Sequence, residues 1–395
     1  MTDLVLSPRD GLFLKDGREW ATSQEGRAHS LLWPMPSTLF GALCTAQGRA
    51  KEAAGQNLAP QQWQALAATM TLGPSLALRR PLAEASPWSP AHRVWPVPAD
   101  ALFLADEAGR AQRVLRLDPR PSRHAMLGRD DDEVVARLWW PRMDEQTKPA
   151  GAPLWWEEQA FVTWLADPAA ERPCKGPFPG LALPRHVQAH VGIDPATFAA
   201  RASILFAHDV IEMLDEARCE WAIGCRVALA GNPPDLATLG GDRRVAKILS
   251  LPAGSDLFAF PPDLGKAFDQ QQPKGVRLVA VTPAVFAAGW LPDGFEATGD
   301  NTCRGRLPEI DADLILRAAR VLRPAHVSGW DMAAGKPKPT TRLVPPGTVY
   351  HLEADGGVFS AAIAESLWLA AFGCRTEQGF GRFVPGVWHP EENGT

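Results

Sequence analysis

The sequence EQGFGR near the end of the chain places two glycines on either side of one phenylalanine. Gly379 and Gly381 can adopt positive φ angles, or let the backbone approach a ligand closely. Phe380 could stack on a base of single-stranded RNA or fill the core as a buried plug, while Arg375 and Arg382 could reach phosphates. The alternative is a tight turn that feeds an edge strand. No strand of the dinucleotide-binding type precedes the segment, so a nucleotide cofactor is not indicated.

Two other segments combine basic side chains with glycine or tryptophan. Arg243 and Arg244 are adjacent in the turn LGGDRR, and Lys336 and Lys338 follow Trp330 in the loop SGWDMAAGKPKP. Basic side chains next to aromatic rings suit single-stranded nucleic acid. The alternatives are a surface turn whose aspartate pairs with an arginine, and a solvated loop with Trp330 in the core.

The charge of the chain is unevenly distributed. The net charge of −5 argues against a free-standing nucleic-acid binder, whose affinity comes mostly from neutralised phosphates. Residues 304–342, however, carry eight basic and four acidic side chains, an excess of +4. This pattern fits a subunit that holds RNA in one local basic groove. The acidic run Asp130–Glu133 is interpreted as a solvated loop or a surface that faces a partner.

The histidines give little indication of a metal site. His186 and His190 are four residues apart, which places two ligands together only on a helix, and the glycine and proline that follow argue against one. The dipeptide His208-Asp209 resembles a metal-binding pair, but a lone dipeptide is not specific. Six scattered cysteines include no pair with zinc-ribbon spacing. The sequence therefore predicts no metal and no cofactor.

One histidine is a candidate for catalysis. His29 precedes the first predicted helix and could act as a general base in RNA cleavage, because histidine titrates near neutrality. No second acid or base lies at a readable spacing, and no P-loop, nucleophile elbow or paired carboxylate motif is present. We therefore expect no catalytic residue and no enzymatic activity. The absence of a signal peptide and of a long apolar run predicts a cytoplasmic protein.

The hydrophobic pattern predicts a few helices among many short strands. Helices are predicted at 39–54, 60–70, 154–166 and 311–323. Ser37 or Thr38 can cap the first of them, and the last has an acidic start and a basic end. Extended segments are predicted at 3–14, within 186–230 and 276–290, and at 344–353 and 383–388, whereas 365–373 fits a short helix or a buried strand. The irregular alternation favours an α+β protein, and the length favours two domains.

An ordered set of segments carries a family resemblance. The run WPMPSTLFGAL (33–43) resembles the first-helix signature of the RAMP superfamily of CRISPR proteins. It is followed, in the order of that family, by segments at 190–211, 239–244, 328–339, 344–353 and 377–382. Together they cover about residues 3–385 and are similar to the third subunit of the Cmr module, in the type III-B effector. The segment 194–198 departs from the family's usual turn, and 80–150 matches nothing in the family pattern.

The resemblance implies a fold, partners and a site. It implies two tandem ferredoxin-like (RRM-like) domains with insertions, at 1–235 and 236–395. It implies a non-catalytic subunit that clamps the 5′ tag of the guide RNA and contacts the large polymerase-like subunit and the backbone subunit. The alternative is a guide-processing endoribonuclease of the same superfamily, with His29 as general base. The residues predicted to bind RNA are Ser37, Thr38, Arg243, Arg244, Lys336, Lys338, Arg375, Gly379, Phe380, Gly381 and Arg382.

Overall fold

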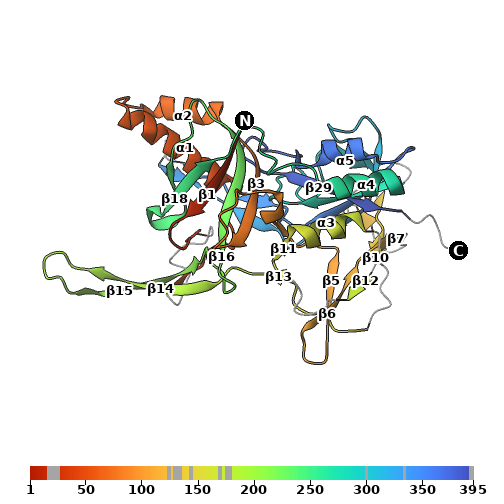
Figure 1. The fold of residues 1–395 in the computed structure, drawn as a ribbon, viewed down its shortest axis with the longest axis horizontal. Coiled ribbons are helices and arrows are strands. Elements are labelled where there is room, and N and C mark those ends of the chain that lie inside the picture. The colour runs from red at the N-terminus through yellow and green to blue at the C-terminus, as the bar shows by residue number, and fades with distance from the viewer. Residues whose placement is uncertain are drawn as a thin grey trace.

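The computed structural model describes residues 1–15, 27–121, 126–127, 136–141, 146–167, 171–173, 180–298, 301–331 and 335–390. Within these ranges the protein is built from five α-helices and mostly antiparallel sheets, which confirms the α+β prediction (Figure 1). The acidic run Asp130–Glu133 lies outside the described residues. Among the helices described, none combines the length and the hydropathy that crossing a membrane requires.

The first sheet has eight strands and contains the N-terminal strand near its centre. Its order is β13 (Gly180–Leu181), β11 (Trp155–Glu157), β4 (Arg93–Pro96), β3 (Thr71–Pro81), β16 (Cys219–Ala228), β1 (Thr2–Pro8), β18 (Val245–Ser250) and β17 (Leu236–Thr238). Helices α1 (Pro36–Ala53) and α2 (Pro60–Thr69) lie on the same side of the molecule as these strands (Figure 1). Successive side chains of β1 point to opposite faces of the sheet. Leu4 and Leu6 therefore pack in the hydrophobic cluster that includes α1, while Val5 packs in the larger cluster that includes β19 of the second sheet.

The second sheet has seven strands and belongs to the C-terminal part of the chain. Its order is β20 (Phe295–Ala297), β21 (Cys303–Gly305), β22 (Leu314–Arg320), β27 (Val349–Ala354), β19 (Gly275–Ala280), β29 (Arg382–Trp388) and β28 (Ala370–Ala371). Three helices pack together beside it: α3 (Glu158–Ala166), α4 (Pro262–Gln271) and α5 (Ala361–Leu367) (Figure 1). Both α3 and α5 contact β29, so the last strand is covered.

Hairpins project from this body. The longest pairs β14 (Arg185–Ile193) with β15 (Ala200–Ile211) and extends away from the sheets, with the short β2 (Arg27–Ala28) parallel to its base (Figure 1). A second hairpin pairs β5 (Ala101–Ala105) with β6 (Ala111–Arg116), which β12 (Glu171–Pro173) joins. The remaining short strands pair as β7 (Pro119–Arg120) with β10 (Trp140–Pro141), β8 (Met126–Leu127) with β9 (Ala136–Arg137), β23 (Ala325–Val327) with β26 (Thr341–Leu343), and β24 (Trp330–Asp331) with β25 (Lys336–Pro337). Single 3₁₀ turns occur at η2 (Pro90–His92) and η3 (Gly241–Arg243).

Several predicted elements need correction. The segment 311–323 is not a helix, because Leu314–Arg320 forms β22 between β21 and β27. Its Leu, Ala and Arg residues favour a helix locally, but pairing with β27 on one side overrides that preference. Helix α1 begins at Pro36 after Met35, so Ser37 and Thr38 lie inside its first turn and neither caps it. The final strand, β29, is not an edge strand, since it lies between β19 and β28.

The two sheets share an inner strand order. The first contains β3-β16-β1-β18 and the second β22-β27-β19-β29, so that across each set the strands stand in the order second, third, first and fourth along the chain. Every neighbouring pair in these two sets is antiparallel. The domain boundary predicted at 235 stays a prediction, and β17 and β18, which follow it, pair in the first sheet.

One prediction concerns the buried histidine of β27. Burial lowers the pKa of His351 to about 3, so the folded protein keeps this imidazole neutral while the unfolded chain binds a proton near pH 6.5. Stability should therefore fall as the pH drops from 6.5 toward 3, by up to about 1.4 kcal/mol per pH unit. Urea unfolding measured across this range should show a shallower slope for His351→Phe, and an unchanged slope would contradict the assignment.

Candidate nucleic-acid interface

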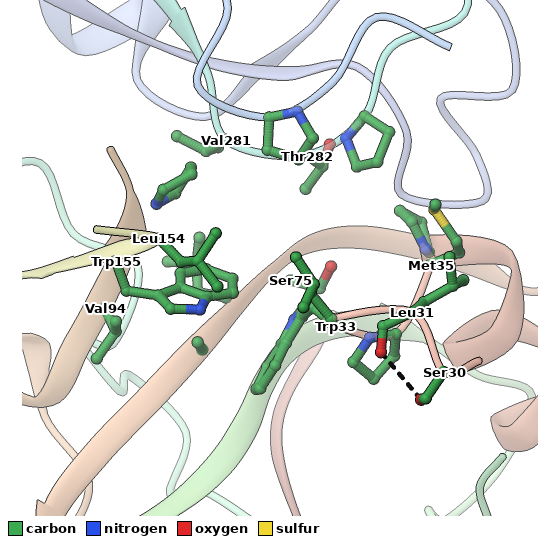
Figure 2. A pocket seen from close by; sticks show the side chains of 18 of the residues that line it. Ser30, Leu31, Trp33, Met35, Ser75, Val94, Leu154, Trp155, Val281 and Thr282 are labelled. Carbon is green, nitrogen blue, oxygen red and sulfur yellow. Dashed lines mark hydrogen bonds between the residues drawn. The ribbon is translucent and has the colours of Figure 1, made fainter. Parts of the chain in front are cut away.

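A cleft of about 620 Å³ opens between the first sheet and the segment that follows β19 (Figure 2). Figure 2 shows Val281 and Thr282 on one side of it, and Ser75, Trp33 and Trp155 on the other. The lining is mostly apolar with a few polar side chains, the composition typical of ligand sites. The cleft is therefore formed by residues from both parts of the chain.

Two half-buried tryptophans supply flat surfaces in the cleft. The rings of Trp33 and Trp155 meet edge to face, with centroids 5.4 Å apart, and buried Trp221 packs behind both at 6.3–6.4 Å. Trp33 belongs to the loop before α1, whereas Trp155 begins β11. Contacts among three aromatic rings fix their orientation. Such rings offer faces on which a base can stack.

The loop that carries Trp33 is fixed by hydrogen bonds to the first residues of the chain. The Ser30 hydroxyl accepts a hydrogen bond from the Leu14 amide at 2.9 Å and donates one to the Leu31 carbonyl at 3.0 Å. The Leu31 amide donates to the Leu14 carbonyl at 2.7 Å. Pro36 then begins α1, where a proline has no amide to leave unpaired. The loop is therefore held in place before the helix starts.

Three polar side chains meet at the mouth of the cleft. His29 Nδ1 lies 3.1 Å from Asp209 Oδ2, and the His29 side chain is 48% exposed. Arg185 donates from Nη2 to the same carboxylate oxygen at 3.2 Å and to the Ser30 carbonyl at 2.9 Å. Asp209 therefore orients an imidazole and a guanidinium, both of which line the cleft.

The glycine segment lies directly behind the wall formed by Thr282. The Thr282 hydroxyl donates to the Gly379 carbonyl at 3.0 Å, and the Gly381 amide donates to the Pro283 carbonyl at 2.8 Å. Gly379 and Gly381 have φ angles of +87° and +70°, as the sequence predicted for flexible backbone. A Cβ at position 381 would lie 2.0 Å from the Phe372 carbonyl oxygen. The glycine at position 381 therefore allows its backbone to pack closely against the backbone of Phe372, and not against a ligand.

The side chains next to these glycines also have internal partners. Phe380 is fully buried, so its ring has no surface on which a base could stack and fills the core instead. Arg375 lies 4.7 Å from the centre of that ring and donates to Gln378 at 2.8 Å. Arg382 donates to the Leu369 and Thr376 carbonyls, and burial lowers its pKa. These two arginines hold the loop together in this structure.

A second cavity, of about 310 Å³, shares Leu31 with the cleft. It is lined by Thr38 of α1 and by Gly240 and Gly241 of the turn before β18, together with Lys15. The structure thus brings together two segments that the sequence analysis proposed separately. Ser37, the neighbour of Thr38, is half-buried in the same first helical turn.

The other predicted basic residues differ in their surroundings. Arg243 is exposed, whereas Arg244 is half-buried, donates to Gln188 at 2.7 Å and lies 3.9 Å from Asp242. Lys336 and Lys338 are exposed at the β24–β25 hairpin and line neither cavity. Among the described residues, none of the predicted RNA-binding set lines the cleft itself: Thr38 lines the second cavity, and the glycine segment lies behind the wall formed by Thr282.

Sequence reasoning missed the residues that give the cleft its character. Trp155, Thr282 and Arg185 come from three distant segments that no spacing links, and Asp209, which contacts Arg185, was considered only as half of a metal-binding dipeptide. The extended segments of β14 and β15 were expected from alternation, but which faces their side chains occupy depends on how the two strands pair. These groups come together only in the folded structure.

The family model for CRISPR-associated protein (Cas_Cmr3) matches residues 4–388. No curated protein sequence matches the chain. A chain of the type III-B Cmr-beta bound to cognate target RNA and AMPPnP, state 1, aligns with a TM-score of 0.44 and 11% identity, covering 88% of this chain and 86% of that one.

Two further solved structures are similar at the same low level. A chain of the type III-B Cmr-beta bound to cognate target RNA gives a TM-score of 0.44 at 12% identity, over 88% of this chain and 86% of the other. A chain of the Csm3-Csm4 subcomplex in the type III-A CRISPR-Cas interference complex gives 0.32 at 9% identity, over 99% and 100%. The family match carries the assignment by itself, because it spans nearly the whole sequence. The chain belongs to the CRISPR-associated Cas_Cmr3 family.

Proposed function

We propose that the chain is a non-catalytic, RNA-binding subunit of a type III-B effector complex, which clamps the 5′ tag of the guide RNA and bridges the large and backbone subunits. The observation that carries this proposal is the family match over residues 4–388. The cleft supports it independently, because two fixed tryptophans face a wall from the other part of the chain. Bases of single-stranded RNA are recognised by stacking of this kind.

Surface features support a role inside an assembly. The β14–β15 hairpin exposes Val187, Val191, Ile193 and Leu205, and Phe198 at its tip is 83% exposed. Apolar side chains gathered on one projecting element are typical of surfaces that partners cover. The net charge of −5 fits the same picture, because it disfavours RNA binding by an isolated chain. The chain would then hold RNA together with its neighbours.

We also propose that each sheet derives from a ferredoxin-like (RRM-like) domain. The support is the strand order β3-β16-β1-β18 and β22-β27-β19-β29, which is the antiparallel order of that fold in both cases. In the first set, α1 connects the first and second strands, and in the second set α5 connects the third and fourth. The cleft lies where the two units meet.

Removing both flat surfaces of the cleft should weaken guide RNA binding. Stacking of a base on an aromatic ring contributes about 1–3 kcal/mol, so Trp33→Leu combined with Trp155→Leu should lower affinity by about 30-fold or more. Leucine keeps apolar contact with Trp221, so the fold should persist. The measurement is guide RNA occupancy of the purified complex, with thermal unfolding as a check on the fold.

Trp140→Leu is the matched control for this experiment. Trp140 is 62% exposed and lines a different cavity, so guide occupancy should stay at the wild-type level. Full occupancy in the folded double variant would contradict a role for the cleft in holding RNA.

The exposed lysines of the β24–β25 hairpin should act through phosphates. Replacing Lys336 and Lys338 with glutamine should weaken binding equally for all RNA sequences. The slope of log K against log salt concentration should become shallower by about 0.7 for each lysine that contacts a phosphate. Lys247→Gln, an exposed lysine on β18, serves as the control. An unchanged slope in the double variant would place these lysines away from the RNA.

One contact favours a second function, a guide-processing endoribonuclease of the same superfamily. His29 is oriented by Asp209 at 3.1 Å, and a general base in this position can take the proton of a ribose 2′-hydroxyl. The 2′ oxygen then bonds to the adjacent phosphorus as the bond from phosphorus to the 5′ oxygen breaks, and that oxygen leaves with a proton from water. Incubating the chain alone with repeat RNA in the presence of a chelator separates the two functions. Cleavage that His29→Ala abolishes would establish the enzyme, whereas intact RNA supports the binding subunit.

A further inference from the structure

The long hairpin formed by β14 and β15 brings two histidines together on one face. In the antiparallel register His190 lies opposite Phe206, and His208 lies opposite Gln188. Residues two apart in a strand share a face, so His190 and His208 are diagonal neighbours. Their ring centroids are 4.5 Å apart. The sequence spacing of His186 and His190 gave no metal site on a strand, and the partner of His190 is instead His208.

Flanking aromatic rings fix both imidazoles. Phe13 stacks on His208 with centroids 4.3 Å apart, and Phe206 stacks on His190 at 5.1 Å. The four rings form a stacked ladder in which the planes of neighbouring rings are inclined to one another by 11° to 25°. Adjacent Asp209 points to the opposite face, where it contacts His29. The two histidines are thus separated from the cleft described above.

A carboxylate completes the cluster. Asp242, in the η3 turn, places Oδ2 3.7 Å from His208 Nε2, and one ligand atom from each of His190, His208 and Asp242 lies within 4.8 Å of the others. Asp242 has a φ of +56°, and the Gly241 amide donates to the Phe13 carbonyl at 2.7 Å, which holds the turn against the ring ladder. Its side chain is 55% exposed and so has room to move toward the histidines.

The ring nitrogens that face this carboxylate lack hydrogen bonds. Nε2 of His190 and Nε2 of His208 are both buried without a hydrogen-bond partner among the described residues, and the His208 side chain is only 2% exposed. Buried polar atoms in native proteins nearly always have a partner. Burial, and then the neighbouring His190, lowers the pKa of His208. The two unpartnered ring nitrogens and the Asp242 carboxylate therefore face one small space that an ion could occupy.

We propose that His190, His208 and Asp242 bind one divalent transition-metal ion, with Zn²⁺ as the ion that best suits two imidazoles and a carboxylate. Zn²⁺ bonds of about 2.0–2.2 Å require all three ligand atoms to move closer together, so the exposed Asp242 side chain must swing inward and the two stacked imidazoles must turn toward one another. The fourth position is left for water. The ion would connect the hairpin to the turn before β18, and so fix the direction in which the hairpin projects. This inference does not rest on the proposed function.

Arg244 opposes a cation at this site. Its Nη2 lies 3.9 Å from Asp242 Oδ2, although its shorter contact is the 2.7 Å hydrogen bond to Gln188. A guanidinium this close repels a metal ion and competes for the carboxylate. Arg244→Gln should therefore tighten metal binding, whereas loss of a ligand should weaken it. Opposite effects of neighbouring substitutions separate a specific site from general adsorption.

The experiment uses the full chain after treatment with a chelator. It carries Cys374→Ser in all variants, because Cys374 is an exposed thiol and thiolates are competing Zn²⁺ ligands. Calorimetric titration with ZnCl₂ should show one equivalent. His190→Phe, which keeps a ring in the ladder, and Asp242→Asn should each weaken binding by more than about 100-fold. His186→Phe is the control on the same strand, since His186 contacts Glu212 at 2.6 Å outside the cluster.

A second measurement tests where the ion binds. Zn²⁺ should slow amide hydrogen exchange around residues 188–190 and 206–208, and Asp242→Asn should abolish this protection. Absence of saturable Zn²⁺ binding would overturn the proposal and leave the space to a bridging water. Equal affinity in the wild type, His190→Phe and Asp242→Asn would overturn it as well, since binding would then occur elsewhere.

Discussion

Replacing Arg277 with methionine should destabilise the protein by about 3–5 kcal/mol, the largest effect that we expect from a single charge. Arg277 of β19 and Asp100, before β5, form a fully buried ion pair with Nη1 and Oδ2 2.7 Å apart. Methionine would leave the Asp100 carboxylate without its guanidinium partner. An uncompensated buried charge is far more costly than loss of the pair as a whole.

The surrounding hydrogen bonds increase the cost. Asp100 Oδ1 accepts from the Trp164 indole at 3.0 Å, and Arg277 donates to the carbonyls of Trp164 at 2.8 Å and Val387 at 3.0 Å. Helix α3, β29 and the two charged residues are thus held by one network. Removing the guanidinium leaves the two carbonyls unsatisfied as well as the carboxylate.

The pH dependence gives this prediction a second test. Burial alone would raise the pKa of Asp100, but the charges of Arg277 and Arg116 outweigh it and hold the pKa below the ordinary value. The stability from this group is therefore present above the unfolded pKa near 3.9 and is lost as the pH falls through the lower folded value. Without Arg277, burial should instead raise the pKa. The deficit of Arg277→Met should then shrink on acidification, as Asp100 takes up a proton.

Urea unfolding at several pH values measures these effects. The matched control is Arg306→Met, since Arg306 and Asp313 form an exposed pair at 2.6 Å and should contribute little. The double variant Arg277→Met/Asp100→Leu should recover part of the lost stability, because no charge remains buried. A single variant as stable as the Arg306→Met control would contradict the role assigned to the network.

Gly381→Ala should destabilise the protein by about 3 kcal/mol or more. The φ of +70° at this position disfavours any residue with a Cβ, and that Cβ would lie 2.0 Å from the Phe372 carbonyl oxygen. The obstacle is backbone, which cannot rotate away as a side chain can. The Phe372 amide also donates to the Gly381 carbonyl at 2.9 Å, so separating the two segments breaks a hydrogen bond.

Gly357→Ala separates the two causes. Gly357 has a φ of +93° but no atom within 4 Å of the position that its Cβ would occupy. It should therefore show only the conformational cost, about 1–2 kcal/mol. Thermal and urea unfolding of both variants give the comparison, and equal losses would show that the segments near Gly381 move apart easily. Reduced guide occupancy in Gly381→Ala should follow from displacement of Thr282, whose hydroxyl contacts this loop.

The glycine loop shows how far the sequence could predict the site. The spacing of Gly379 and Gly381 correctly indicated positive φ angles, because only the residue type decides that preference. It could not indicate that the backbone packs against Leu72 of β3 and against Phe372, which directly follows β28. For the same reason Phe380 looked equally suited to stacking and to burial, and the structure buries it.

Some of the secondary-structure elements could also be predicted from the sequence, and others could not. Alternation predicted the extended segments of β14, β15 and β16, since a two-residue period is a local property. The segment of β22 was wrongly predicted as a helix because its partner, β27, is remote in the sequence and pairing outweighs local preference. Trp155 and Asp209 could not be connected to His29 or Trp33 without the register of two sheets.

The continuous core has a consequence for how the cleft works. Val5, Leu76 and Leu78 of the first sheet belong to the same buried cluster as Val276, Leu278 and Leu352 of the second. No solvent layer or flexible linker separates the two units there, so they cannot close on a ligand like the lobes of a hinged enzyme. The walls that carry Trp155 and Thr282 therefore have a fixed spacing. In the proposed function, such a cleft would accept only RNA strands whose shape already fits it.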